Sequence, residues 1–492
     1  MIPSALGSGL VDLQKRNIVD RAVTSEKSES GPMAGPGVQE SGSLPGLARK
    51  FVKESLGNRV VTGAAGVLAS RAAFNGLSFV LNVILARMLG ALGLGVYTYA
   101  LAWMFLLMVP AMLGMDQLVV REIAATSVRA EWGRARRVLR KSIEVVSVAS
   151  LTIVLIAGTV SEAAAQHIDT QIRVTFLVAL VLLLLITLTR VRQCAMQGLH
   201  RVALGTLPEM VVQPAVLIAF LGITYWLGRR HLTAPGAMGL TVAACIIAFS
   251  IGTNLLLKSI PEESGDTPLE EQAWNWRKSA LPLMFVASSG AIYAQADTLM
   301  LGSIKGAKAV GIYGIADRGS DLITVLMLVV SAALAPHVAK LYASGDIDGI
   351  ERVVIKFARA TFLCSLPLAL AFMSFGFWYL LAFYGSAFTA GRHALTILSI
   401  GKILSVMMGL PGMILIMTGY ERDAARAIGL SAIITILLNL VLIPRWGLEG
   451  TAIATASTTI LWNILMVVLL YKRLGIHCTA LGRISFRQAS QA

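Results

Sequence analysis

The sequence predicts an all-α integral membrane protein with about twelve transmembrane helices in a duplicated bundle. Hydrophobic residues make up 56% of the 492 positions and charged residues only 14%, which is more apolar surface than a water-soluble core needs. A short phrase, Gly-Ala-x-x-x-Gly-x-Tyr, is written at 90–97 and again at 306–313, each time between two long apolar runs. A duplicated membrane bundle is the usual body plan of a transporter.

The apolar runs are long enough to cross about 30 Å of hydrocarbon, which takes roughly 20 helical residues each. The first half holds six of them, at 60–86, 92–113, 143–160, 174–189, 202–227 and 237–257. The second half holds six more, at 281–301, 310–334, 357–380, 395–417, 424–443 and 450–470.

Lys and Arg gather in the loops on one side of this bundle. The loop after the second run carries seven of them between Arg121 and Lys141. Because short cytoplasmic loops hold an excess of these residues, we expect this side and both termini to be cytoplasmic. The net charge of +15 then follows from the loop bias and from attraction to anionic lipid, so it gives little reason to expect nucleic acid as a partner.

The domain scheme follows from composition. Residues 1–58 are rich in Ser, Gly, Pro and charge, and we expect a disordered cytoplasmic tail. An N-lobe of six transmembrane helices at 59–257 follows, then a cytoplasmic loop at 258–278, a C-lobe of six helices at 279–474 and a cytoplasmic tail at 475–492. No cleavable signal peptide is expected, so the first helix would act as the targeting signal.

Motifs for nucleotide, metal or disulfide chemistry are missing from the sequence. The four cysteines are scattered, with no Cys-x-x-Cys pair, and no P-loop, dinucleotide fingerprint or His-Glu-x-x-His occurs. We therefore expect no catalytic residues, no metal and no cofactor. The energy for transport would come from the substrate or from a Na⁺ or H⁺ gradient.

Polar side chains inside the apolar runs are the candidate functional residues, because an ionised group there costs roughly 2.5–3.5 kcal/mol on insertion scales and tends to be kept for a function. The spacing puts four residues of the first run on one helical stripe, namely Arg71, Asn75, Ser78 and Asn82. The eighth run has a similar stripe of Asp317, Asp321, Thr324 and Ser331, with Arg318 beside it. The seventh contributes Ser288, Gln295, Asp297 and Thr298, and the fifth contributes Glu209.

Simpler explanations stay open for these charges. Asp317 could pair with Arg318, or Arg318 with Asp321, only to neutralise a buried site. Arg71 could extend to the cytoplasmic interface, since it lies a few turns into its helix. Lys402 in the tenth run is a weaker candidate.

Three phrases resemble a known family. They are the twice-written Gly-Ala-x-x-x-Gly-x-Tyr, the run Ala-Asp-Thr-Leu-Met-Leu-Gly at 296–302, and Gln-Gly-Leu-His-Arg at 197–201 echoed by Thr-Gly-Tyr-Glu-Arg at 418–422. They resemble the polysaccharide-exporting branch of the MOP flippase superfamily, to which the O-antigen (Wzx-type) flippases belong. The resemblance covers residues 60–474.

The resemblance implies two six-helix lobes around a central cavity that opens alternately to the cytoplasm and the periplasm. The substrate would be an undecaprenyl-diphosphate-linked oligosaccharide, carried across the bacterial inner membrane for surface polysaccharide such as lipopolysaccharide. Membrane lipid would be a further partner, and a polysaccharide polymerase complex stays open as another. The expected substrate-binding residues are Arg71, Asn75, Ser78, Asn82, Gln295 and Arg318, and the expected ion-coupling residues are Asp297, Asp317, Asp321 and Glu209.

Two rival classes remain. A MATE-like multidrug or cation antiporter would have a cavity dominated by acids and aromatics, against which the stripe headed by Arg71 argues. A membrane glycan polymerase or ligase would need a sizeable external domain, but the outside connections expected at 161–171 and 228–235 are short.

Overall fold

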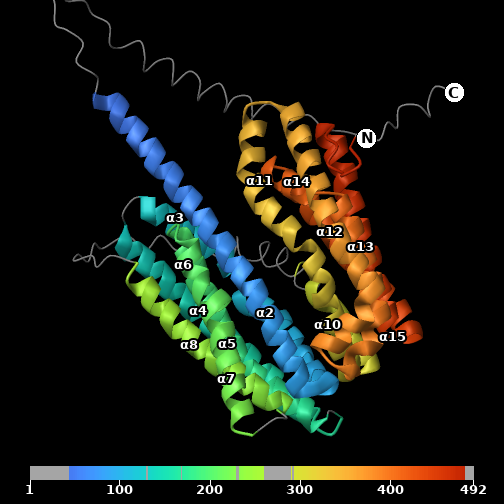
Figure 1. Cartoon of the computed structure of the whole chain (residues 1–492). Helices are drawn as coiled ribbons and strands as arrows, with labels where there is room; N and C mark the ends of the chain where they lie inside the picture. The colour runs from blue at the N-terminus through green and yellow to red at the C-terminus, as the bar shows by residue number, and fades with distance from the viewer. Residues whose placement is uncertain are drawn as a thin grey trace, which may run out of the picture. The chain divides into compact units, whose positions relative to one another are not determined.

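A computed structural model describes residues 44–128, 131–167, 169–228, 232–259, 290 and 293–482, with side chains from Ala73 onward. Every regular element in these ranges is a helix, which confirms the predicted all-α class (Figure 1). Residues 1–43 lie outside the described chain, and α2 begins at Leu44, so the expected tail at 1–58 stays a prediction.

The N-terminal half consists of seven helical elements and one π-helical turn. They are α2 (Leu44–Met112), α3 (Met115–Val128), α4 (Trp132–Ala163), α5 (Thr170–Gly198), α6 (Val202–Leu207), η1 (Pro208–Val212), α7 (Gln213–Trp226) and α8 (Ala234–Leu257). Helix α5 packs between α4 and α8. The turn η1 begins at Pro208, whose missing N–H interrupts the regular ladder of helix hydrogen bonds.

The C-terminal half begins with a helix at 293–305. It continues with α10 (Ala307–Asp321), η2 (Leu322–Thr324), α11 (Val325–Ala343), α12 (Ile347–Phe383), η3 (Ser386–Gly391), α13 (Arg392–Met407), α14 (Pro411–Met417) and α15 (Glu421–Leu474). Helix α13 packs against α12, α15 and α10.

Eight helices in the described ranges are long and apolar enough to cross a membrane, or nine if the bent pair α13 and α14 is one span. Two of the eight each hold two of the expected runs. Helix α2 is interrupted at Gly90 with φ 66°, and α15 at Gly447 with φ 54°, a region of backbone conformation that glycine tolerates. The helix at 293–305 covers the described part of the expected run 281–301. The twelve runs are therefore all represented, in the expected order.

The twice-written phrase forms the same structure in each half. Gly90 and Gly306 both have positive φ and both precede the helical segment that the phrase begins. Seven residues later a tyrosine bonds to a threonine: Tyr97 Oη lies 3.0 Å from Thr241 Oγ1, and Tyr313 Oη lies 2.8 Å from Thr455 Oγ1.

The two copies also meet each other, within the compact unit Val60–Ala492. A Cβ on Gly95 would overlap the carbonyl oxygen of Ala307, and a Cβ on Gly311 would overlap that of Ala91. We call this close backbone contact of Gly95 and Ala91 with Gly311 and Ala307 the glycine seam. A single apolar cluster surrounds it and includes buried residues of both halves.

Candidate functional site

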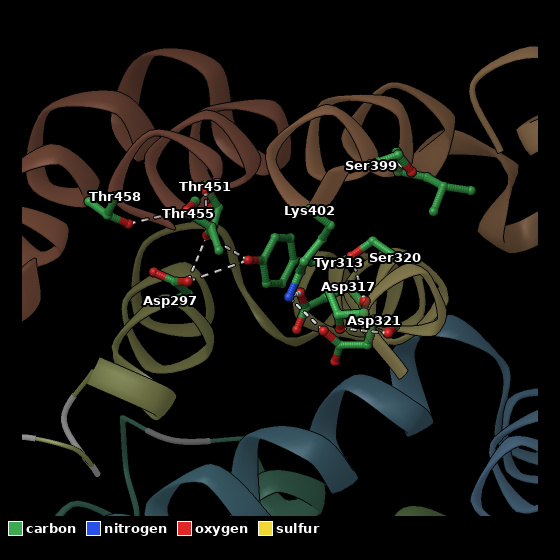
Figure 2. Close-up of polar contacts among 12 residues, drawn as sticks. Asp297, Tyr313, Asp317, Ser320, Asp321, Ser399, Lys402, Thr451, Thr455 and Thr458 are labelled. Carbon is green, nitrogen blue, oxygen red and sulfur yellow. Dashed lines mark hydrogen bonds and ion pairs between the residues drawn. The ribbon is translucent and has the colours of Figure 1, made fainter. Parts of the chain in front are cut away.

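One lysine and two aspartates form a charged cluster in the C-terminal half (Figure 2). Lys402 Nζ lies 2.5 Å from Asp321 Oδ1 and 3.9 Å from Asp317 Oδ1. The aspartates are one turn apart on α10 and therefore share a face, while Lys402 comes from the middle of the neighbouring α13. The lysine side chain is only 19% exposed. Its ammonium group is thus held between two carboxylates and largely withdrawn from solvent.

Arg318 lies beside these acids but bonds to the other half of the chain. Its guanidinium donates to the carboxamide oxygen of Asn82 in α2, and the Asn82 amide donates to the Ser78 carbonyl oxygen at 2.7 Å. Among the described residues Arg318 forms no ion pair with Asp317 or Asp321. The expected ion pair of Arg318 with these acids is therefore not formed, and Lys402 is their partner.

Asp297 is the centre of a second polar group, next to the first (Figure 2). One carboxylate oxygen accepts a hydrogen bond from Thr455 Oγ1 at 2.6 Å and a longer one from Tyr313 Oη at 3.4 Å. The other accepts one from Asn439 Nδ2 at 2.6 Å. Tyr313 and Asn439 are buried, so a carboxylate from the helix at 293–305 is bound by donors from α10 and from both segments of α15.

This second group has the chemistry of a site for a small cation or a proton. A carboxylate and two hydroxyls supply oxygens, which hard cations prefer, whereas Asn439 presents its Nδ2 to the carboxylate. The Asn439 side-chain oxygen is buried without a hydrogen-bond partner in the described chain, so it has acceptor capacity left. No three acidic, His or Cys side chains gather into a metal site within the described ranges.

The N-terminal half has its own buried ion pair, away from the twice-written phrase. The Arg192 guanidinium in α5 contacts Glu209 Oε1, and Gln193 Nε2 donates to Glu209 Oε2 at 3.0 Å. A Cβ on Gly252 in α8 would overlap the Arg192 guanidinium, so this glycine provides the space for it. Glu209 therefore carries an internal partner on its own side of the molecule.

The expected site residues form four separate sets. Asn82 contacts Arg318 and the Ser78 backbone carbonyl, Asp317 and Asp321 share Lys402, and Asp297 and Glu209 each have their own hydrogen-bonding network. Asn75 and Gln295 are half-buried and form no hydrogen bond with another described residue. The side chain of Arg71 lies outside the described part of the chain, as does Ser288. Thr324 bonds only to the Asp321 carbonyl oxygen.

Four contributors were not singled out from the sequence: Asn439, Thr455, Arg192 and the hydroxyl of Tyr313. Two of them carried a signal. Tyr313 ends the second copy of the phrase, and Asn439 shares a helical stripe with Ser431 and Thr435, at spacings of four residues. Thr455 is matched with Thr241 only by the hydrogen bonds of the two tyrosines, since the 216-residue offset pairs Thr241 with Ser457.

Comparison with known proteins gives the family. The model of the family described as "Polysaccharide biosynthesis protein" matches residues 60–342, and the model described as "MatE" matches residues 282–441. The first match covers more than half of the chain.

Curated relatives include two glycan-related proteins of Haloferax volcanii. The chain is 24% identical over 383 residues to a "Probable low-salt glycan biosynthesis flippase Agl15", covering 77% of each chain. It is 28% identical over 188 residues to a "Probable flippase AglR", covering 36% of this chain and 37% of the relative.

Solved structures share the fold. An inward-facing multidrug resistance MATE family transporter of the MOP superfamily aligns with a TM-score of 0.64 at 14% identity, over 81% of this chain and 94% of the other. The lipid II flippase MurJ in an inward closed conformation aligns with a TM-score of 0.61 at 13% identity, over 83% and 87%. The chain belongs to the polysaccharide biosynthesis protein family.

Proposed function

We propose that this protein translocates undecaprenyl-diphosphate-linked oligosaccharide units across the bacterial inner membrane, for O-antigen, capsule or exopolysaccharide synthesis. Membership of the polysaccharide biosynthesis family supports transport of a lipid-linked glycan. The observation that carries the proposal is the contact of Arg318 with Asn82, which places a guanidinium and a carboxamide between the two halves. Guanidinium groups bind phosphate oxygens in a bidentate manner, and carboxamides bind sugar hydroxyls.

Arg318 would bind the diphosphate, together with Arg71 from the same stripe as Asn82. Asn75, Ser78, Asn82 and Gln295 would bind hydroxyl groups. A polar interior of this kind lowers the barrier for a charged head group, while the lipid tail stays in the bilayer. Rocking of the two halves about the glycine seam would give alternating access.

Energy would come from a Na⁺ or H⁺ gradient coupled through Asp297. Its oxygen ligands suit either ion, and Tyr313 connects it to the helix that carries Gly311. Asp317, Asp321 and Glu209 already have a cationic partner, which makes them weaker candidates for coupling. We propose no catalytic residue.

A depletion experiment tests the function. A strain lacking this protein should accumulate undecaprenyl-diphosphate oligosaccharide on the cytoplasmic face and lose the corresponding surface polymer. Complementation with Arg318→Ala should fail although the variant inserts normally, and Arg318→Lys should restore export only in part, because lysine lacks the planar fork.

An antiporter of cationic drugs is the second candidate. The match of the MatE model to residues 282–441 favours it, as do the three acids Asp297, Asp317 and Asp321 in that segment. Normal surface polymer together with raised drug sensitivity in the depleted strain would favour this candidate and contradict flipping.

A further inference from the structure

A pocket of about 270 Å³ lies in the N-terminal half, apart from the charged clusters described above. The end of α2 contributes Met108 and Met112, the first turn of α3 contributes Asp116 and Gln117, and α5 contributes Arg190 and Gln197. Arg190 and Gln197 are seven residues apart on α5, so they line the same face of that helix. Leu113 and Gly114, which join α2 to α3, both have positive φ, and Asp116 lines the same pocket as the two methionines.

The polar groups of this pocket are free to bind a ligand. No side-chain hydrogen bond or ion pair joins Asp116, Gln117, Arg190 or Gln197 to another residue in the described chain. By contrast, Arg192 and Gln193 of the same helix are both bonded to Glu209. Arg190, Gln117 and Gln197 are exposed on the pocket rim, and Met112 is buried at its wall.

The composition of the pocket points to a carbohydrate. A carboxylate, a guanidinium and two carboxamides offer both acceptors and donors, which is what hydroxyl groups require. A diphosphate fits less well, since the Asp116 carboxylate would repel it. Methionine side chains are apolar and adaptable, and they suit the C–H face of a sugar ring. The volume is near the lower end of ligand pockets, which begin at about 300 Å³, so it suits one sugar unit and not a whole oligosaccharide.

The position of the pocket suits a role in binding the substrate before translocation. The second segment of α2 runs 22 residues from Gly90 to Met112, so the pocket lies about 33 Å along the helix axis from the Gly90 end. The arginine-rich segment 121–141 follows directly, and in the expected topology that end is cytoplasmic.

We infer that this pocket is a subsite for one sugar unit of the lipid-linked substrate, which it binds at the cytoplasmic end of the N-terminal half before translocation. The inference rests on the proposed function. It assigns Gln117, Gln197 and Arg190 to sugar recognition and leaves the diphosphate to Arg318.

Binding measurements on the full-length protein in nanodiscs test the subsite. The two probes are undecaprenyl-diphosphate-linked N-acetylglucosamine and undecaprenyl diphosphate without sugar. Native mass spectrometry measures the affinity of the protein for each probe. We expect the double variant Gln117→Ala with Gln197→Ala, and separately Arg190→Ala, to lower the affinity for the sugar-bearing probe about tenfold. The affinity for the sugarless probe should stay unchanged. The matched control is Gln171→Ala, at the opposite end of α5, which should change neither affinity.

The outcomes separate the two proposals. Both probes could bind the natural protein while the pocket variants bind the sugar-bearing probe with the same affinity as the natural protein. In that case the inferred subsite is wrong and the proposed flipping function stands. Equal weakening of both probes would mean that the pocket binds the diphosphate, which also overturns the sugar subsite. Failure of either probe to bind the natural protein would count against the proposed function itself, and the subsite would fall with it.

Discussion

At Lys402 one ammonium group of α13 balances two carboxylates of α10. Lys402→Met would remove the ion-pair partner of Asp317 and Asp321, and the two like charges one turn apart would then repel each other. We expect this variant to lower the rate of lipid-linked oligosaccharide flipping in proteoliposomes at least tenfold. Lys402→Arg, which keeps the charge, should retain part of the activity.

The control for this prediction is Lys340→Met. Lys340 is exposed in the last turn of α11, and the substitution removes the same charge without breaking an ion pair to a described residue. Adding Asp321→Asn to Lys402→Met should recover part of the lost rate, because it removes one of the two repelling charges. Full activity of Lys402→Met would mean that the cluster serves neither packing nor transport.

A second prediction at this scale concerns Asp297. Asp297→Asn removes the charge but keeps the shape, so it should abolish the response of the flipping rate to a Na⁺ or H⁺ gradient while the protein still folds. Asn439→Ala should weaken that response less, because it removes a neutral partner of the carboxylate. The measurement is the initial rate against Na⁺ concentration at fixed pH, and against pH at fixed Na⁺. An unchanged gradient response in Asp297→Asn would assign coupling to another group.

Polar stripes were predictable from the sequence, but their partners were not. Helical spacing is enough to place Ser78 and Asn82 on one face, and in the structure Asn82 contacts Arg318. Periodicity within one helix says nothing of how that helix is rotated against its neighbours. For this reason the pairing of Lys402 with Asp321 required the packing of α13 on α10.

At the scale of elements, the glycine seam allows a sharp test. Gly95→Val or Gly311→Val would force the two helices apart, because even a Cβ overlaps a backbone oxygen there. We expect these variants to shift the protein toward arrangements in which the seam is open, and to stop flipping. Thr98 Cγ2 lies 3.9 Å from the position that a Cβ on Gly314 would take, across the seam. A Thr98→Cys reporter should therefore react with a maleimide faster in the Gly95→Val background, with the native cysteines replaced by serine.

Gly222→Val in α7 is the matched control for the seam, since no atom lies within 4 Å of the position of its Cβ. It carries the same change in helix propensity without the clash. Identical labelling rates of Thr98→Cys in the seam variant and in this control would show that the seam does not open.

The sequence was sufficient to find the apolar spans but not the full helices. The expected run 143–160 lies inside α4, which begins at Trp132. Hydropathy marks only the part of a helix that suits hydrocarbon, whereas the helix continues into a polar, arginine-rich turn. The π-helical turn at Pro208–Val212 was equally hidden, because a proline alone does not say which hydrogen-bonding pattern replaces the regular one.

At the scale of the whole molecule, the orientation in the membrane is open to direct measurement. Charge bias predicts that single cysteines at Arg137, Gly265 and Gln488 are labelled from the cytoplasm, and those at Asp169, Lys308 and Trp446 from outside. A membrane-impermeant maleimide applied to intact cells and to inverted vesicles distinguishes the two sets. Labelling of the Arg137 and Lys308 positions from the same side would contradict the topology.

The duplication was the strongest whole-molecule signal in the sequence, because two copies of one phrase in equivalent places specify two equivalent bundles. Substrate identity had no comparable signal. The phrase repeats what the halves have in common, which is the seam and its tyrosine, whereas the charges that differ between halves are single residues such as Asp297 and Arg318.

Tyr313 has a thermodynamic consequence for the whole cycle. Its hydroxyl touches Asp297, and its helix meets the other half at Gly311, two residues away. An ion that binds Asp297 more tightly in one conformation than in another shifts the equilibrium toward the first by the difference in binding free energy. An ion with equal affinity for both conformations does not shift the equilibrium. A hundredfold preference would amount to about 2.7 kcal/mol. The equivalent tyrosine, Tyr97, bonds to Thr241, and Leu81 occupies the position that matches Asp297. In the proposed coupling, the link from Asp297 through Tyr313 to the glycine seam therefore has no counterpart at Leu81 and Tyr97.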